Sequence, residues 1–146
     1  MKMNKTVLLL IFTILLLSGC GSEENGYKGA DLQDAGLEQV IISYFNNFDN
    51  IHEFSKYSTD GFIERVYSWC SGDDSQEKSL EEMKTIYFEI NKDTLDLSDY
   101  YVDEISFASD KEAVISVTRS WEDGSEDSTH YSIVKVNDIW KFDDRF

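Results

Sequence analysis

The sequence predicts an α+β domain in which N-terminal helices pack on a curved, four-stranded antiparallel meander. Apolar residues recur at intervals of three and four up to about residue 90, and beyond residue 98 they alternate with polar residues. Short turn-forming stretches separate the alternating segments, so consecutive strands should be antiparallel neighbours. The length of 146 residues allows one such domain, which we place at residues 34–146.

The first helix is predicted over residues 34–50. Its apolar residues follow the i, i+3, i+4, i+7 spacing of one helical face. They are Leu37, Val40, Ile41, Tyr44, Phe45, Phe48 and Ile51. Phe54 and Tyr57 then predict a short second helical turn.

Two further helices have recognisable ends. Thr59-Asp60 offers an N-cap for a third helix that ends near Ser71-Gly72. Residues 79–82 match a capping box, in which the hydroxyl of Ser79 accepts a hydrogen bond from the amide of Glu82 and the carboxylate of Glu82 accepts one from the amide of Ser79. This box predicts a fourth helix from 80 to about 90, although the alternation of residues 86–90 leaves a strand open there. The third helix carries Phe62, Ile63, Val66, Tyr67 and Trp69 on its apolar face.

Four strands follow the helices. The first carries Ile105 and Phe107, the second runs from 113 to 121, and the last two lie around 131–136 and 139–142. The predicted turns are Ser109-Asp110-Lys111, residues 123–127 around Gly124, and Asn137-Asp138. The inward-facing set of the second strand is predicted to be Ala113, Ile115, Val117, Arg119 and Trp121.

Residues 1–19 have the layout of a secretory signal sequence. Lys2 and Lys5 give a positive start, and Val7–Leu17 is almost wholly apolar. As a helix this run spans only about 17 Å, whereas the hydrocarbon core of a bilayer is about 30 Å thick. We therefore expect the run to be removed during export.

The stretch Leu17-Ser18-Gly19-Cys20 resembles the lipobox of bacterial lipoproteins. The resemblance implies that the Cys20 thiol receives a lipid with chains such as palmitate, and that a signal peptidase cuts between Gly19 and Cys20. Small residues let the peptidase approach the backbone, and a thiolate is nucleophilic enough to be alkylated. Each buried methylene contributes about 0.8 kcal/mol, so two acyl chains form a lasting anchor. We expect the protein at the extracytoplasmic face of a bacterial cell membrane.

The chain is strongly acidic, with a formal charge of -16. Removal of residues 1–19 takes away two lysines and no acids, which changes the charge to -18. This charge makes nucleic acid an improbable partner, because it repels a polyanion. It should also hold the domain away from anionic headgroups. Residues 20–33 carry three glycines after Cys20 and little apolar content, which predicts a flexible linker with a reach of about 20 Å.

The order of helices and curled strands is similar to that of the nuclear transport factor 2-like, cystatin-like superfamily. The resemblance covers roughly residues 35–146, and its most telling part is the segment Ser132–Phe142, in which an Asn-Asp turn precedes Ile-Trp-Lys. The resemblance implies a bent sheet wrapped around helices so that a conical pocket remains. Some members use this pocket for small molecules, and others use the domain for protein contact or dimerisation.

Arg119 is the residue of the inward-facing row that requires a reason. It could present a planar fork to an anionic ligand. With 29 acids in the chain, we expect it to pair with an internal carboxylate instead. The candidate ligand-binding residues are Arg119, Trp121 and Tyr131.

Other candidate groups do not form a specific signature. Asp103 and Tyr131 could act as an acid–base pair, and Asp49, His52 and Glu53 fall within one helical turn, but we expect neither catalysis nor a metal there. Cys70 reads as a small buried residue and His130 stands alone. HExxH, GxSxG, CxxC and phosphate-loop motifs are absent, and we expect no cofactor.

The sequence therefore predicts a lipid-anchored binding or interaction module, with a small molecule or a protein as its ligand and no catalysis of its own. Two alternatives remain open. One is a small acid–base isomerase or hydratase of the pocketed superfamily. The other is an immunity or inhibitor lipoprotein whose acidic body binds a cationic protein.

Overall fold

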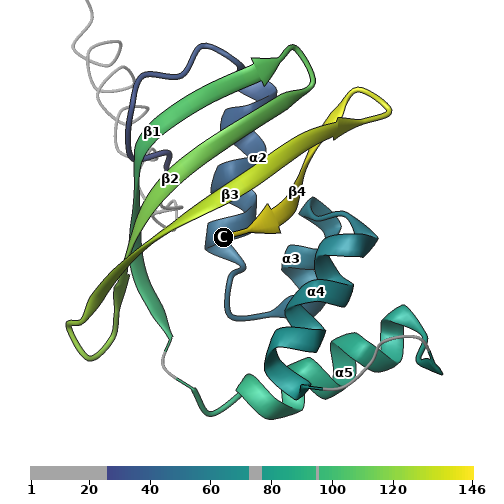
Figure 1. Cartoon of the computed structure of the whole chain (residues 1–146). Helices are drawn as coiled ribbons and strands as arrows, with labels where there is room; N and C mark the ends of the chain where they lie inside the picture. The colour runs from purple at the N-terminus through teal and green to yellow at the C-terminus, as the bar shows by residue number, and fades with distance from the viewer. Residues whose placement is uncertain (1–25, 73–76, 95) are drawn as a thin grey trace, which may run out of the picture.

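The computed structural model describes residues 26–72, 77–94 and 96–146 (Figure 1). The predicted signal sequence, the cleavage site and Cys20 lie outside these residues. Within the described ranges, no helix is both long and apolar enough to cross a membrane. The order of elements along the chain is α2 (Ala35–Asn46), α3 (Ile51–Phe54), the 3-10 helix η2 (Ser55–Tyr57), α4 (Asp60–Ser71), α5 (Leu80–Asn91), β1 (Leu97–Ser109), β2 (Glu112–Trp121), β3 (Glu126–Val136) and β4 (Ile139–Arg145).

The fold is the predicted α+β class. Helices come first, and the four strands form one antiparallel sheet in the order β1-β2-β3-β4. The sheet is strongly curved, and α2 lies across one of its faces (Figure 1). Helices α4 and α5 pack on each other near the C-terminal end of β4, where α4 also contacts the strand.

Helix α2 ends at Asn46, four residues before the predicted end at residue 50. The side chain of Asn47 donates a hydrogen bond to the carbonyl of Ser43 (2.7 Å) at the end of the helix. The side chain of Asn50 accepts from the amide of His52 and so begins α3. Asparagine favours such caps over helix interiors, so the first helix stops at Asn46, and α3 with η2 forms the predicted short second turn.

The ends of the next two helices are confirmed. Thr59 caps α4 by accepting from the amide of Phe62 (3.1 Å), and Gly72 ends it with a left-handed φ of 65°. Both hydrogen bonds of the capping box between Ser79 and Glu82 are present. Residues 86–90 belong to α5, so the strand alternative for them is wrong.

The strands and all three predicted turns are also confirmed. Asn137 and Asp138 have φ values of 51° and 63°, as a two-residue type I′ hairpin requires. Ala113, Ile115, Val117 and Arg119 are buried in the predicted inward-facing row of β2.

Strict alternation along β1 would put Asp103 in the same row as Ile105 and Phe107, but a β-bulge changes this. Val102 pairs with Val117 and Ile105 pairs with Ile115, so one extra residue lies between Val102 and Glu104. The phase of the strand therefore changes at this point. Asp103 is exposed and accepts a hydrogen bond from Thr118 (2.9 Å), away from the row of Ile105.

The core lies between the helices and the concave face of the sheet. Its centre is aromatic, because Tyr44 of α2 stacks on Phe142 of β4 with 3.8 Å between ring centres. Leu37, Ile41, Ile51, Phe62, Ile63, Val102, Val117, Tyr131 and Ile133 are also fully or almost fully buried there.

Both outer edges of the sheet carry added contacts. On β1, the amide of Ala30 donates to the carbonyl of Val102 (2.8 Å), and the amide of Val102 donates to the carbonyl of Lys28 (3.0 Å). The last part of the predicted linker thus lies against the sheet. On β4, the amide of Thr59 donates to the carbonyl of Phe142 (2.8 Å). These contacts limit the backbone that an edge strand would offer to another chain.

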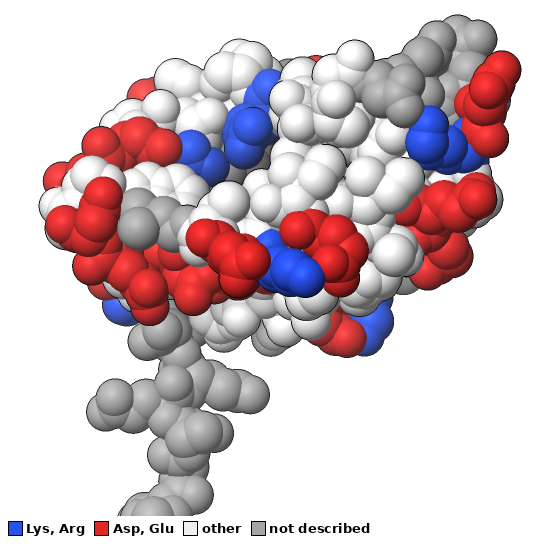
Figure 2. Space-filling model, turned by 90° about the horizontal axis from the view of Figure 1, so that it is seen from below, with Lys and Arg blue, Asp and Glu red and all other residues white. Residues whose placement is uncertain are grey.

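Acidic side chains dominate the surface seen from below. Figure 2 shows them gathered at both ends of this face, with few basic side chains and a broad uncharged region between. This distribution agrees with the formal charge of -16 for the chain.

Candidate functional site

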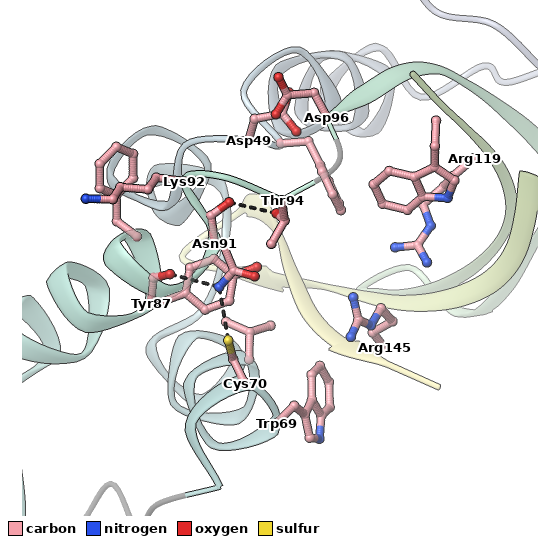
Figure 3. Close-up of a pocket in the computed structure, with 14 residues that line it drawn as sticks. Asp49, Trp69, Cys70, Tyr87, Asn91, Lys92, Thr94, Asp96, Arg119 and Arg145 are labelled. Carbon is pink, nitrogen blue, oxygen red and sulfur yellow. Dashed lines mark hydrogen bonds between the residues drawn. The ribbon is translucent and has the colours of Figure 1, made fainter. Parts of the chain in front are cut away.

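A cavity of about 370 Å³ lies between the α4–α5 pair and the adjoining end of the sheet (Figure 3). Its aromatic and aliphatic wall consists of Phe48, Val66, Trp69, Tyr87, Phe88 and Trp121. Its polar lining consists of Asp49, Cys70, Asn91, Lys92, Thr94, Asp96, Arg119 and Arg145. Residues from α4, α5, β2 and β4 thus meet at one place.

The cavity exists because α5 packs chiefly on α4 and not on the core. Met83 is the one residue of α5 that is buried, whereas Tyr87 and Phe88 are only partly buried beside the core. Curvature carries the sheet away from the helices at this end, and a concave wall remains (Figure 1).

Arg119 lines the cavity, and its fork is occupied. Its Nε and Nη2 donate to the two carboxylate oxygens of Asp127, both at 2.7 Å. Its Nη1 donates to the hydroxyl of Tyr131 (3.2 Å). The predicted pairing with an internal acid is therefore confirmed. Burial of the guanidinium disfavours its charge, but the hydrogen bonds that it donates to Asp127 and the negative charge of that carboxylate outweigh this and raise the pKa of Arg119.

Two aromatic rings flank this arginine. Its guanidinium carbon lies 5.0 Å from the ring centre of Trp121 and 5.8 Å from that of Phe48. Trp121 lines the cavity, as Arg119 does. Tyr131 does not, because it is fully buried behind Arg119 with rings of the core around it. Of the three candidate residues, two share the cavity, and ligand binding by them stays a prediction.

Arg145 is a site residue that the sequence reasoning missed. Strict alternation from Trp140 and Phe142 would put Arg145 on the outer face of β4. A register shift opposite Ser132 changes the phase, so Arg145 pairs directly with the inward-facing Tyr131. Its guanidinium carbon lies 4.8 Å from the ring centre of Trp69. No sequence signal marks this shift, because it depends on the pairing with β3.

The charge of Arg145 is not matched by a neighbouring acid. The preceding residues, Asp143 and Asp144, both form ion pairs with Arg65 of α4. Among the residues that the structure describes, no carboxylate lies within 4 Å of the Arg145 guanidinium. Its positive charge acts on the cavity instead. Burial raises the pKa of Tyr87, and Arg145 partly opposes that rise.

The opposite wall carries polar and acidic groups. Asn91 donates from its side-chain amide to the sulfur of Cys70 (3.0 Å) and to the carbonyl of Tyr87 (2.8 Å). Partial burial raises the pKa of Asp49, against a hydrogen bond from the amide of Leu97, and Asp96 adds to the rise. In Figure 3, Asp49 and Asp96 lie together, apart from the two arginines.

The structure does not bring the other predicted groups together. Asp103 lies on the outer face, so it does not approach the buried Tyr131. In the helical turn considered for a metal, Glu53 pairs with Lys56 (2.5 Å), and the ring of His52 lies 5.8 Å from that of Phe88. Across the described residues, no group of three or more His, Cys, Asp or Glu side chains is placed to hold a metal.

The structure also places Cys70 and His130, which the sequence analysis considered singly. Cys70 is half-buried on the cavity wall and is not a core residue. His130 stacks on the C-terminal Phe146, with 5.8 Å between ring centres.

Fold and site together define a small α+β domain whose helices and curved sheet enclose an open, aromatic-walled cavity at one end. The chain matches no protein-family model and no curated protein sequence.

Proposed function

We propose that the protein is a bacterial lipoprotein, anchored through Cys20 at the extracytoplasmic face, whose domain takes a small organic molecule into the cavity. The observation that carries the binding half is the cavity itself. Its volume of about 370 Å³ falls within the range of small-molecule sites, about 300–1,000 Å³. Its lining combines six aromatic or aliphatic residues with eight polar or charged ones, so it offers both stacking surfaces and polar contacts to a ligand.

The open cavity favours a small molecule over a protein partner. If the helices had filled the concave side of the sheet, only the outer surface of the domain would be left for binding a partner. Here the rings of Trp69, Tyr87 and Trp121 line a concave space instead. A nuclear transport factor 2-like architecture, with its conical pocket, is part of this proposal and is supported by the helices packed on a four-stranded sheet.

The acid–base alternative has less support from the geometry. A general base requires a carboxylate held in an apolar, water-poor site so that its pKa approaches neutrality. Asp49 and Asp96 line the cavity, but both residues remain accessible to water, and a hydrogen bond from the amide of Leu97 opposes the rise that partial burial causes in the pKa of Asp49. Binding without chemistry therefore fits the site better.

The anchor is tested by metabolic labelling with radioactive or clickable palmitate. The wild-type protein should be labelled and should sediment with membranes. Cys20→Ser should abolish the label, and any protein that is still processed should leave the membrane fraction. A Cys70→Ser control should label normally, because Cys70 lies within the folded domain. Equal labelling of the Cys20→Ser variant would contradict the anchor.

The binding half is tested with a blocked cavity. Thr94 is exposed at the lining of the cavity, so Thr94→Trp should narrow it without disturbing the core. The mature chain carrying Cys20→Ser is screened by thermal unfolding against a library of neutral, anionic and cationic organic compounds. Compounds that raise the unfolding temperature should lose this effect in Thr94→Trp. Thr85→Trp, on the exposed surface of α5, is the matched control.

The outcome that contradicts small-molecule binding is clear. It is a screen in which every stabilising compound acts equally on Thr94→Trp and on the parent chain.

A further inference from the structure

We propose that the cavity binds a small aromatic monocarboxylate, with its carboxylate on Arg145 and its ring against the tryptophan-lined wall. This inference rests on the proposed small-molecule function and names the chemical class of the ligand. It is carried by one cation, by the aromatic groups around that cation and by the charges that face it.

Among the residues that the structure describes, Arg145 is the one arginine without an acid partner. The chain contains three arginines, and all of them are described. Arg65 pairs with Asp143 and Asp144, and Arg119 pairs with Asp127. In a chain with 29 acids against 13 basic residues, an internal partner for the third would be easy to supply. Instead, the two acids that directly precede Arg145 in the sequence pair with Arg65, and the guanidinium of Arg145 faces the cavity.

The position of this guanidinium suits recognition of a carboxylate. The bulge in β4 turns Arg145 to the concave side, opposite Tyr131. Its guanidinium carbon lies over the ring of Trp69, and this contact restricts the position of the guanidinium. A carboxylate can then accept two parallel hydrogen bonds from the free edge of the guanidinium. Figure 3 shows Arg145 directed toward the interior of the pocket, between Trp69 and Arg119.

The walls select an aromatic body for the ligand. Trp69 is 47% exposed, which is unusual for a tryptophan within an apolar helical face. Trp121 lies beside Arg119 in the lining, and Phe48 and Phe88 are further aromatic residues of the wall. Offset or edge-to-face contacts between such rings and a ligand ring are favourable. The cavity volume lies at the low end of the usual range, which favours a ligand with one small ring system.

The facing charges limit the ligand to one negative charge. Arg119 is neutralised by Asp127 and Lys92 pairs with Glu89, so Arg145 is the available cation of the lining. Asp49 and Asp96 face the same space, and the mature chain carries a formal charge of -18. A phosphate ester or a nucleotide would meet repulsion that a single cation does not offset. A monocarboxylate places its one charge at Arg145.

Isothermal titration calorimetry with matched probes tests this inference. The mature chain carrying Cys20→Ser is titrated with benzoate, 4-hydroxyphenylacetate and indole-3-acetate. The corresponding alcohols, tryptamine and inorganic phosphate are titrated in parallel. At least one carboxylate should bind saturably, and its alcohol should bind at least tenfold more weakly. Tryptamine and phosphate should show no saturable binding.

Variants assign the binding to Arg145. Arg145→Gln should weaken the carboxylate at least tenfold and leave the alcohol unchanged, and Arg145→Lys should weaken it less. Lys56→Gln is the matched control, because this lysine pairs with Glu53 outside the lining of the cavity, and it should change affinity less than threefold. Circular dichroism and the unfolding temperature should show that Arg145→Gln remains folded.

Cys70 gives an independent readout in the same protein. It lines the cavity, and with Cys20 replaced it is the only thiol. A bound carboxylate should slow its alkylation by iodoacetamide, measured by mass spectrometry, and Arg145→Gln should remove this protection.

Two results would overturn the inference. One is equal binding of acid and alcohol with no effect of Arg145→Gln. The other is no binding by any carboxylate of the panel. In either case, the proposed function would stand if other compounds from the library stabilised the parent chain and lost this effect in Thr94→Trp.

Discussion

Arg119 and Arg145 show how neighbours decide the role of a charged residue. Both lie on the concave side of the sheet within the lining of one cavity. Arg119 is 8% exposed and is held by a carboxylate and a phenol, so its charge is used inside the protein. Arg145 has an aromatic ring and open space beside it. The first residue stabilises the domain, and we expect the second to serve the ligand.

Asp127→Ala should destabilise the domain by about 2 kcal/mol. Removal of one partner from a buried ion pair leaves an uncompensated charge, which costs about 3–5 kcal/mol when both groups are buried. The Asp127 side chain is 44% exposed, so water screens part of this loss. Urea unfolding at pH 7 measures the change in the free energy of unfolding.

The control for this variant is Asp103→Ala. Asp103 also accepts a side-chain hydrogen bond on the sheet, but from the outer face. It should change the free energy of unfolding by less than about 0.5 kcal/mol, as exposed positions usually do. Equal losses in the two variants would show that the Arg119–Asp127 pair does not stabilise the domain.

At the scale of elements, features fixed by a few adjacent residues could be predicted. Thr59 and Ser79 cap the helices that follow them, and Asn137-Asp138 forms the hairpin turn, because each depends on local backbone geometry. The inward-facing row of β2 could also be predicted, because β2 itself carries no extra residue in its pairing with β1 or with β3.

Features set by contacts between distant segments could not be predicted. The bulges in β1 and β4 reverse the phase of alternation, so Asp103 turned out to be exposed and Arg145 turned inward. A bulge depends on the partner strand, which periodicity within one strand does not include. Of the residues that line the cavity, Arg119 and Trp121 were therefore singled out as ligand-binding residues from the sequence and Arg145 was not, whereas the third candidate, Tyr131, lies behind the cavity.

The N-cap of α2 gives a prediction that depends on pH. Asp34 accepts hydrogen bonds from the amides of Leu37 (2.9 Å) and Gly36 (3.0 Å), and also from the indole of Trp140 (3.1 Å). These bonds, with Lys135 nearby, hold the pKa of Asp34 below its ordinary value, the largest cause being the bond from the Leu37 amide. Asp34→Ala should cost about 1–2 kcal/mol at pH 7.

The sign of the pH effect follows from the lowered pKa. A carboxylate with a lowered folded-state pKa stabilises the protein above its unfolded-state pKa of about 3.9, and this stability is lost as the pH falls through the folded-state pKa. The difference between wild type and Asp34→Ala should therefore be constant from pH 7 to about 5 and shrink below pH 4. Urea unfolding across this range measures it. Asp34→Asn keeps an acceptor and should lose less at pH 7, whereas a difference that grows on acidification would contradict the assignment.

At the scale of the whole molecule, an aromatic core supports a surface with a large excess of one charge. Tyr44 contacts six aromatic rings within the core or beside it, which places much buried area at the centre of a small domain. The ion pairs of the surface are mostly between exposed lysines and neighbouring acids. Each such pair contributes about 0–1 kcal/mol, so they do not balance the repulsion among the remaining acids.

Moderate salt should therefore stabilise this protein. When NaCl rises from 0.01 to 0.15 M, the Debye length falls from about 30 to about 8 Å, which screens repulsion across the surface more than it weakens pairs in contact. With a formal charge of -18 on the mature chain, the net effect should be a rise of about 1 kcal/mol in the free energy of unfolding. Thermal unfolding of the mature chain carrying Cys20→Ser measures it, with sucrose at matched osmolality as the uncharged control. A lower unfolding temperature in salt would mean that the ion pairs outweigh the repulsion and that the acidic surface is stabilised by its own lysines and arginines.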